Sequence, residues 1–262
     1  MYARGCKPAP GLRPLSNLRR VSQMVDLGHI HSNIGRRQLL QRLLSCAVVG
    51  VAAQAGMELA SPQKLHAQTN LSPDEALHEL LAGNQRFVAN QLTSIAHDLI
   101  IMKEHTVNKQ EPFAAVLACA DSRIPVELVF DQTIGHIFVT RVAGNVVTPE
   151  IIASLEYGVA VLGIEALLVV GHSNCGAVKA AMKADTLPGQ ISVLYQHLRP
   201  ALEQSGGNVD KAIEANARFQ AELLRTSSTV IRDAAKAGKL RVEAGVYDLA
   251  TGKVSLSEPP KS

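Results

Sequence analysis

Three short apolar runs, separated by longer stretches with helical spacing, constrain the fold of this chain most. They cover residues 113–118, 136–140 and 166–170, and they do not alternate between apolar and polar positions. Strands buried on both faces have this pattern, which is typical of parallel sheets covered by helices. The sequence therefore predicts an α/β fold, a single domain with a central, mostly parallel β-sheet flanked by helices.

Other segments complete this expectation. Alternating apolar positions predict a last strand at 240–248, and a return strand at 253–256 follows the turn Thr251-Gly252. Helices are expected at residues 125–130, 149–162, 177–184, 192–204 and 210–237.

An amphipathic helix is expected to precede the first strand. Ser72 is placed as its N-cap, with Pro73 at the first position and Glu75 three residues after the cap. The following apolar residues recur at helical spacing over 76–88. We expect this segment to be a helical arm that packs on the body or on a second subunit and supports dimerisation.

The charge of the chain is divided unevenly. Residues 1–67 hold nine Lys/Arg and two Asp/Glu, whereas residues 68–262 hold 17 Lys/Arg and 21 Asp/Glu. The formal charge of +3 therefore comes from the N-terminal segment. The body has no basic stripe with interleaved aromatic residues, so no nucleic-acid partner is expected.

The N-terminal segment resembles an export signal. Arg36-Arg37 precede an apolar run at 43–56, and Leu65-His66-Ala67 offers a small-residue cleavage site. The run has about 14 residues, fewer than the roughly 20 that span a bilayer. We expect residues 1–67 to be a cleaved twin-arginine-type leader before the domain at 68–262. Export leads to a periplasm or thylakoid lumen, and an uncleaved leader would leave the protein associated with a membrane.

Polar residues follow two of the apolar runs directly. Cys119-Ala120-Asp121-Ser122-Arg123 comes after the first run, and His172-Ser173-Asn174-Cys175-Gly176 comes shortly after the third. Ligands of open α/β sheets bind at the carboxyl ends of the strands. Both segments are therefore expected at one functional edge.

Two interpretations of the cysteines are open at this point. Cys119 and Cys175 are the two cysteines of the body, and an exported protein could join them in a disulfide. Alternatively, they form a Cys₂His zinc site with His172, and three protein ligands leave a fourth position for catalysis. The second interpretation also uses Asp121, which is close enough to compete for the ion, and Arg123, which can hold that carboxylate in a bidentate pair.

These segments closely resemble the β-carbonic anhydrases, which typically show Cys-x-Asp-Ser-Arg and Gly-His-Ser-x-Cys-Gly. The resemblance extends from about residue 74 to residue 253. It implies one Zn²⁺ per subunit, held by Cys119, His172 and Cys175, and a catalytic dyad of Asp121 and Arg123. The implied reaction is the reversible hydration of CO2 to bicarbonate, in which a zinc-bound hydroxide attacks CO2.

The resemblance also implies further features. Gln110 matches a glutamine that binds substrate, and family members assemble as homodimers or larger homo-oligomers. Members inhibited by bicarbonate have a tryptophan where this chain has Val116, so the open subtype is expected, with Arg141 in a structural role.

Two alternative functions share the same residues. Related proteins hydrolyse COS or CS2 with the same zinc ligands. A non-catalytic protein that senses bicarbonate, or that binds zinc in an assembly, would also keep them.

Overall fold

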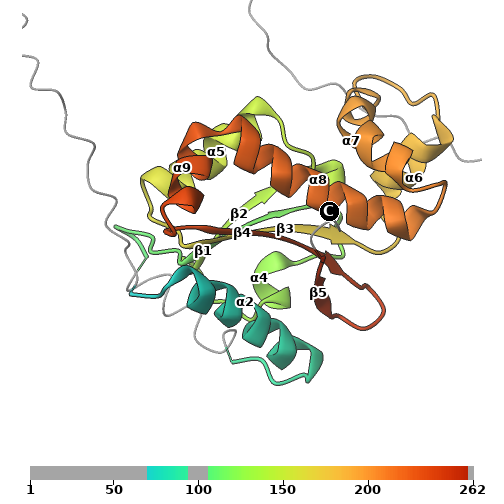
Figure 1. Ribbon diagram of the computed structural model, residues 1–262. Coiled ribbons are helices and arrows are strands. Elements are labelled where there is room, and N and C mark those ends of the chain that lie inside the picture. The colour runs from blue at the N-terminus through green and yellow to red at the C-terminus, as the bar shows by residue number, and fades with distance from the viewer. Residues whose placement is uncertain (1–69, 94–105, 259–262) are drawn as a thin grey trace, which may run out of the picture. The chain divides into compact units, whose positions relative to one another are not determined.

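A five-stranded sheet forms the centre of the computed structural model (Figure 1), in the order β2-β1-β3-β4-β5. Four strands are parallel, and the last is antiparallel to β4. Their bounds are β1 Ala114–Ala118, β2 Ile137–Arg141, β3 Ala166–His172, β4 Arg241–Tyr247 and β5 Val254–Leu256. The predicted α/β fold with a mostly parallel sheet is confirmed.

The structure describes residues 70–93 and 106–258. The whole of the predicted leader, residues 1–67 with Arg36 and Arg37, lies outside these residues. Within the described ranges, no helix has the length and hydropathy that a membrane span requires.

The two central strands are apolar on both faces because both faces are covered. Every residue of β1 and β3 is buried. Ala114 and Val116 belong to one apolar cluster, whereas Ala115 and Leu117 belong to another on the opposite face. Consecutive side chains of a strand point to opposite faces, so an uninterrupted apolar run is what this position in the sheet requires.

Helices cover both faces of the sheet (Figure 1). One face carries α5 (Pro149–Ala160), α8 (Val209–Ser227) and α9 (Thr229–Lys236), and the other carries α2 (Pro73–Val88) and α4 (Val126–Val129). Near the end of β3, α6 (Gly176–Lys183) and α7 (Val193–Gln204) lie beside each other. A short 3₁₀ turn, η2 (Ala143–Asn145), follows β2.

Helix α2 begins as expected and packs on the sheet of its own chain. Ser72 and Glu75 form a capping box, with Pro73 in the first turn. The apolar side chains of Ala76 and Leu80 are fully buried in the cluster beneath the sheet. The apolar face of α2 therefore has a partner within the chain, and its part in dimerisation stays a prediction.

The helix expected over 210–237 is divided into α8 and α9 at Ser228. The backbone of Ser228 is extended, with φ −100° and ψ 121°, and its Oγ accepts a hydrogen bond from the amide of Ile231. The same hydroxyl donates to Glu156 of α5 at 2.6 Å. The uninterrupted prediction was wrong because the serine forms a cap for α9 that helical spacing alone does not show.

Candidate metal centre

The carboxyl ends of β1 and β3 bring the two polar segments together. The strands are parallel neighbours, with Ala118 paired to Val170. Cys119 follows β1 directly, and His172 is the last residue of β3. The predicted functional edge is thus formed by the register of two adjacent strands.

Three donor atoms converge at this edge. The Sγ atoms of Cys119 and Cys175 and a ring nitrogen of His172 lie within 4.8 Å of one another, and all three residues are buried. Both cysteines are free thiols. The structure therefore supports the ligand interpretation of the pair and not the disulfide.

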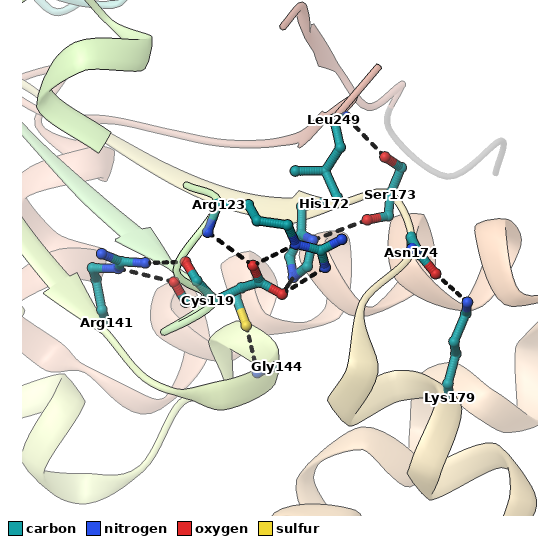
Figure 2. Close-up of polar contacts among 10 residues, drawn as sticks. Cys119, Arg123, Arg141, Gly144, His172, Ser173, Asn174, Lys179 and Leu249 are labelled. Atoms are coloured by element: carbon teal, nitrogen blue, oxygen red, sulfur yellow. Dashed lines mark hydrogen bonds and ion pairs between the residues drawn. The ribbon is translucent and has the colours of Figure 1, made fainter. Parts of the chain in front are cut away.

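The ring of His172 is oriented toward the cluster by its own strand end. Nδ1 lies 3.0 Å from the carbonyl oxygen of Ser173 (Figure 2). A carbonyl only accepts, so Nδ1 carries a proton, and in the tautomer that this contact favours the lone pair is on Nε2. Nε2 is buried and has no hydrogen-bond partner among the described residues. A buried acceptor of this kind fits a metal ligand.

The two thiols interact directly with each other. A hydrogen bond from Cys175 is the main cause that lowers the pKa of Cys119 to about 4, and contacts with His172 and the amide of Gly144 act in the same direction. The same bond to Cys119, together with burial, raises the pKa of Cys175. The two sulfurs are thus close enough to interact directly, and a divalent cation bound between them would displace protons from the thiols.

Asp121 lies beside the donors in a fixed position. Its Oδ1 accepts from the amide and Nε of Arg123 at 3.0 and 2.9 Å, and its Oδ2 accepts from Nη2 at 2.8 Å. These hydrogen bonds, above all those of the Arg123 side chain, hold the pKa of Asp121 well below its usual range. Oδ2 is 3.9 Å from Nε2 of His172. The carboxylate of Asp121 is therefore ionised and lies next to the cluster. Both of its oxygens accept hydrogen bonds from Arg123.

Arg141, at the end of β2, fixes the backbone of this loop. Its Nε donates to the carbonyl of Cys119 at 2.9 Å, and its Nη2 donates to the carbonyl of Asp121 at 2.5 Å (Figure 2). These contacts are with main-chain oxygens. They agree with a structural role for this arginine.

The donor set fits zinc. Two sulfurs and one imidazole in a buried site are ligands that Zn²⁺ prefers, and three protein ligands leave a fourth position for a small molecule. The orphaned Nε2 of His172 supports this assignment independently of the sulfurs.

Gln110 is the predicted site residue that the structure does not bring to the cluster. It is exposed and borders a hollow with Tyr157 and Leu162, at the amino-terminal end of β1. The five residues of β1 separate this end from Cys119 by on the order of 15 Å. Gln110 cannot contact the three donors of its own chain.

Sequence reasoning missed several residues that contact the donors or support those contacts. The carbonyl of Ser173 accepts a hydrogen bond from Nδ1 of His172, and the amide of Gly144 donates to Cys119 Sγ at 3.2 Å. Asn216 of α8 in turn donates to the carbonyl of Gly144 at 2.8 Å. These residues act through main-chain groups or from distant elements, so local spacing carries no signal for them.

Comparison with known proteins connects this chain to carbonic anhydrases. The model of the family described as carbonic anhydrase matches residues 114–254. Carbonic anhydrase 2 of Mycobacterium tuberculosis is 32% identical over 201 residues, which cover 72% of this chain and 95% of that protein. The carbonic anhydrase of Mycolicibacterium smegmatis is 33% identical over 195 residues, with 71% and 94% covered.

Solved structures show the same fold. A structure from work on two tetrameric β-carbonic anhydrases of Sordaria macrospora has a TM-score of 0.57 at 22% identity, and the match covers 71% of this chain and 98% of that one. The Coccomyxa β-carbonic anhydrase, solved with acetazolamide, has a TM-score of 0.54 at 27% identity, with 69% and 85% covered.

Proposed function

The chain belongs to the β-carbonic anhydrase family, and from this membership we infer that its buried Cys₂His cluster is the centre at which it hydrates CO2. The reaction is the reversible conversion of CO2 and water to bicarbonate and a proton. The observation that carries the assignment to this site is the convergence of three donor atoms within 4.8 Å, beside a carboxylate held by an arginine.

Cys119, His172 and Cys175 would hold one zinc ion. When bound, zinc lowers the pKa of a water molecule to near 7 and so supplies a nucleophile at neutral pH. The protein contributes two sulfurs in a buried pocket and an imidazole whose tautomer is set by the carbonyl of Ser173.

Asp121 and Arg123 orient the reacting water in this proposal. Arg123 keeps the carboxylate ionised and engages both of its oxygens, so Asp121 does not bind the metal. Oδ2 lies close enough to the donors to accept a hydrogen bond from the attacking water. The lone pair of that water is thereby directed at CO2.

The direct test combines zinc analysis with stopped-flow measurement of CO2 hydration on the same preparation. We expect one zinc per chain and hydration activity, and we expect Cys175→Ala to lose both. One zinc per chain without hydration would contradict the catalytic assignment and support a sensing or assembly role. Hydrolysis of COS or CS2 in place of hydration would assign the alternative substrates.

We further propose that the protein is a homodimer or larger homo-oligomer and that Gln110 serves the centre of a partner subunit. Gln110 is too far from its own centre, and it lies beside Tyr157, which is 47% exposed near the open edge at β2. A second copy placed at this edge could bring Gln110 to the other centre.

Mixed oligomers test this arrangement. Gln110→Ala subunits are co-expressed with Cys175→Ala subunits, and the oligomers that contain both are isolated with two different affinity tags. If Gln110 acts across the interface, a mixed dimer has one complete site and regains activity that neither variant has alone. Activity of the mixed dimer no higher than that of Gln110→Ala alone, or a stable active monomer in sedimentation, would contradict the proposal.

We propose that residues 1–67 direct export through the twin-arginine route, on the basis of Arg36-Arg37 and the apolar run that follows them. The route accepts folded proteins, which suits a chain that binds its metal before export. N-terminal sequencing of the mature protein and replacement of both arginines by lysine test this. Export that is unaffected by the double replacement would contradict it.

A further inference from the structure

Helix α8 carries two buried amide side chains toward the metal centre. Asn216 is 1% exposed and Gln220 is 0% exposed, one helical turn apart. Burying an amide without partners costs about 1–3 kcal/mol in proteins. Two such residues on one face of a helix are therefore expected to have a full set of hydrogen bonds.

Each amide is bonded on both sides. Gln220 Nε2 donates to Asn216 Oδ1 and to the carbonyl of His197 in α7, both at 3.0 Å. Gln220 Oε1 accepts from the amide of Val147 at 2.8 Å, and Asn216 Nδ2 donates to the carbonyl of Gly144 at 2.8 Å. The pair thus connects α8 and α7 to the loop that follows β2.

On the side away from α8, this loop contacts the sulfur of Cys119. The amide of Gly144 donates to Cys119 Sγ at 3.2 Å (Figure 2), while its carbonyl is the group held by Asn216. Gly144 has φ +74°, and an added Cβ would lie 3.3 Å from Leu198 and 3.4 Å from Ala177. The direction of this amide therefore depends on a conformation that glycine adopts readily and that α8 holds in place.

Apolar side chains at positions 216 and 220 would fill the same space in the core, but they could not form hydrogen bonds to the loop at 143–147. They would leave the buried carbonyl of Gly144 and the amide of Val147 without their partners on α8. Hydrogen bonds to a metal-bound sulfur reduce the charge that it donates to the metal, and groups that orient ligands in this way tune metal affinity.

We propose that Asn216 and Gln220 are positioning residues of the metal centre, which fix the loop at 143–147 so that the Gly144 amide donates to the sulfur of Cys119. This proposal rests on the proposed zinc function. It goes beyond that function, because two side chains that contact neither the metal nor the substrate determine the hydrogen bond received by one ligand, Cys119.

The test uses the full-length protein loaded with Co²⁺, whose sulfur-to-cobalt charge-transfer absorption reports on the thiolates directly. Asn216→Ala is expected to shift this band and to weaken zinc binding about tenfold, the lower end of the range seen when groups that orient ligands are lost. Gln220→Met has similar length and needs no buried partner, so it keeps the test available if Asn216→Ala does not fold. It is expected to change the band and the affinity in the same direction.

Ser228→Ala is the matched control, because it also removes side-chain hydrogen bonds at the end of α8, but these bonds go to Glu156 and Ile231 and not to the loop at 143–147. It should lower stability without changing the band or the zinc affinity. A folded Asn216→Ala or Gln220→Met protein with the wild-type band and affinity would overturn the proposal. A wild-type protein without any such band would instead contradict the zinc function itself.

Discussion

At the scale of single residues, two of the three candidate ligands, His172 and Cys119, are oriented by main-chain groups of residues that are not themselves ligands. The carbonyl of Ser173 accepts a hydrogen bond from Nδ1 of His172 and so determines the tautomer of the ring. The amide of Gly144 donates a hydrogen bond to the sulfur of Cys119. Main-chain groups are fixed by the surrounding fold, so they orient ligands at little additional entropic cost. The metal centre thus depends on residues that a list of ligands would omit.

Asp121→Asn is expected to keep the zinc and to lose most of the activity. The substituted amide replaces one acceptor oxygen with a donor and removes the charge that pairs with Arg123, whereas the three proposed metal ligands are unchanged. We expect kcat for hydration to fall about 100-fold or more, the usual contribution of a positioned acid or base. Zinc content and kcat are measured on the same sample. A fully active Asp121→Asn protein would show that the carboxylate does not orient the water.

Ser173→Ala is expected to weaken zinc binding. The hydroxyl of Ser173 accepts from the amide of Leu249 at 2.9 Å, and its loss leaves that amide without its partner and frees the residue next to His172. A reduction of about tenfold in zinc affinity is expected, measured by competition with a chelator. Ser173→Thr keeps the hydroxyl and is the control. Equal affinities of the alanine and threonine variants would exclude this role.

At the scale of secondary-structure elements, the start of α2 offers a matched pair of capping positions. Ser72 accepts from the amide of Glu75 at 3.3 Å, whereas Ser192, at the start of α7, makes no capping hydrogen bond with its side chain. Ser72→Ala should lower the free energy of unfolding by about 1 kcal/mol. Ser192→Ala should change it little. Urea denaturation compares the two, and equal losses would show that the cap of α2 adds no stability.

The capping box also predicts a pH dependence. The hydrogen bond from the amide of Ser72 holds the pKa of Glu75 below its ordinary range. A lowered pKa in the folded state gives stability that is present above the unfolded-state pKa and is lost as the pH falls through the folded-state pKa. Glu75→Gln should therefore lower stability at neutral pH and have a decreasing effect at acidic pH. Thermal melts of both proteins across this pH range test the prediction. A difference in melting temperature between wild type and Glu75→Gln that does not change with pH would contradict a role for the ionised carboxylate.

The sequence was sufficient for the elements whose pattern is local. Uninterrupted apolar runs predicted β1 and β3, and polar residues at the ends of these strands predicted the donors, because parallel strands end at the same edge. The break at Ser228 was not predicted, since it depends on a hydroxyl that bonds Glu156 of another helix. The contact of Asn216 with Gly144 joins residues 72 positions apart, which helical spacing cannot indicate.

At the scale of the whole molecule, the metal would join elements that are distant in sequence. Cys119 follows β1, His172 ends β3, and Cys175 occupies the N-cap position of α6. An ion that binds the folded state alone stabilises it by about 2.7 kcal/mol when it is present at 100 times its dissociation constant.

Removal of zinc should therefore lower the melting temperature. For a domain of this size, the stabilisation by bound zinc corresponds to a rise of roughly 5–10 °C in melting temperature when zinc is present at about 100 times its dissociation constant. Calorimetry of the protein before and after chelation measures the change. The melting temperature of Cys175→Ala should not respond to zinc, and a wild-type melting temperature equally insensitive to zinc would contradict the linkage.

The support of Ser173 by the last parallel strand also sets an order of events during synthesis. The carbonyl of Tyr247 accepts from the Ser173 amide at 2.9 Å, and the Leu249 amide donates to its hydroxyl. A nascent chain that ends before residue 240 already contains Cys119, His172 and Cys175, but it lacks the strand that holds the loop between the last two. The donors are thus translated well before their final geometry is available, and tight capture of the ion has to wait for the C-terminal part of the chain.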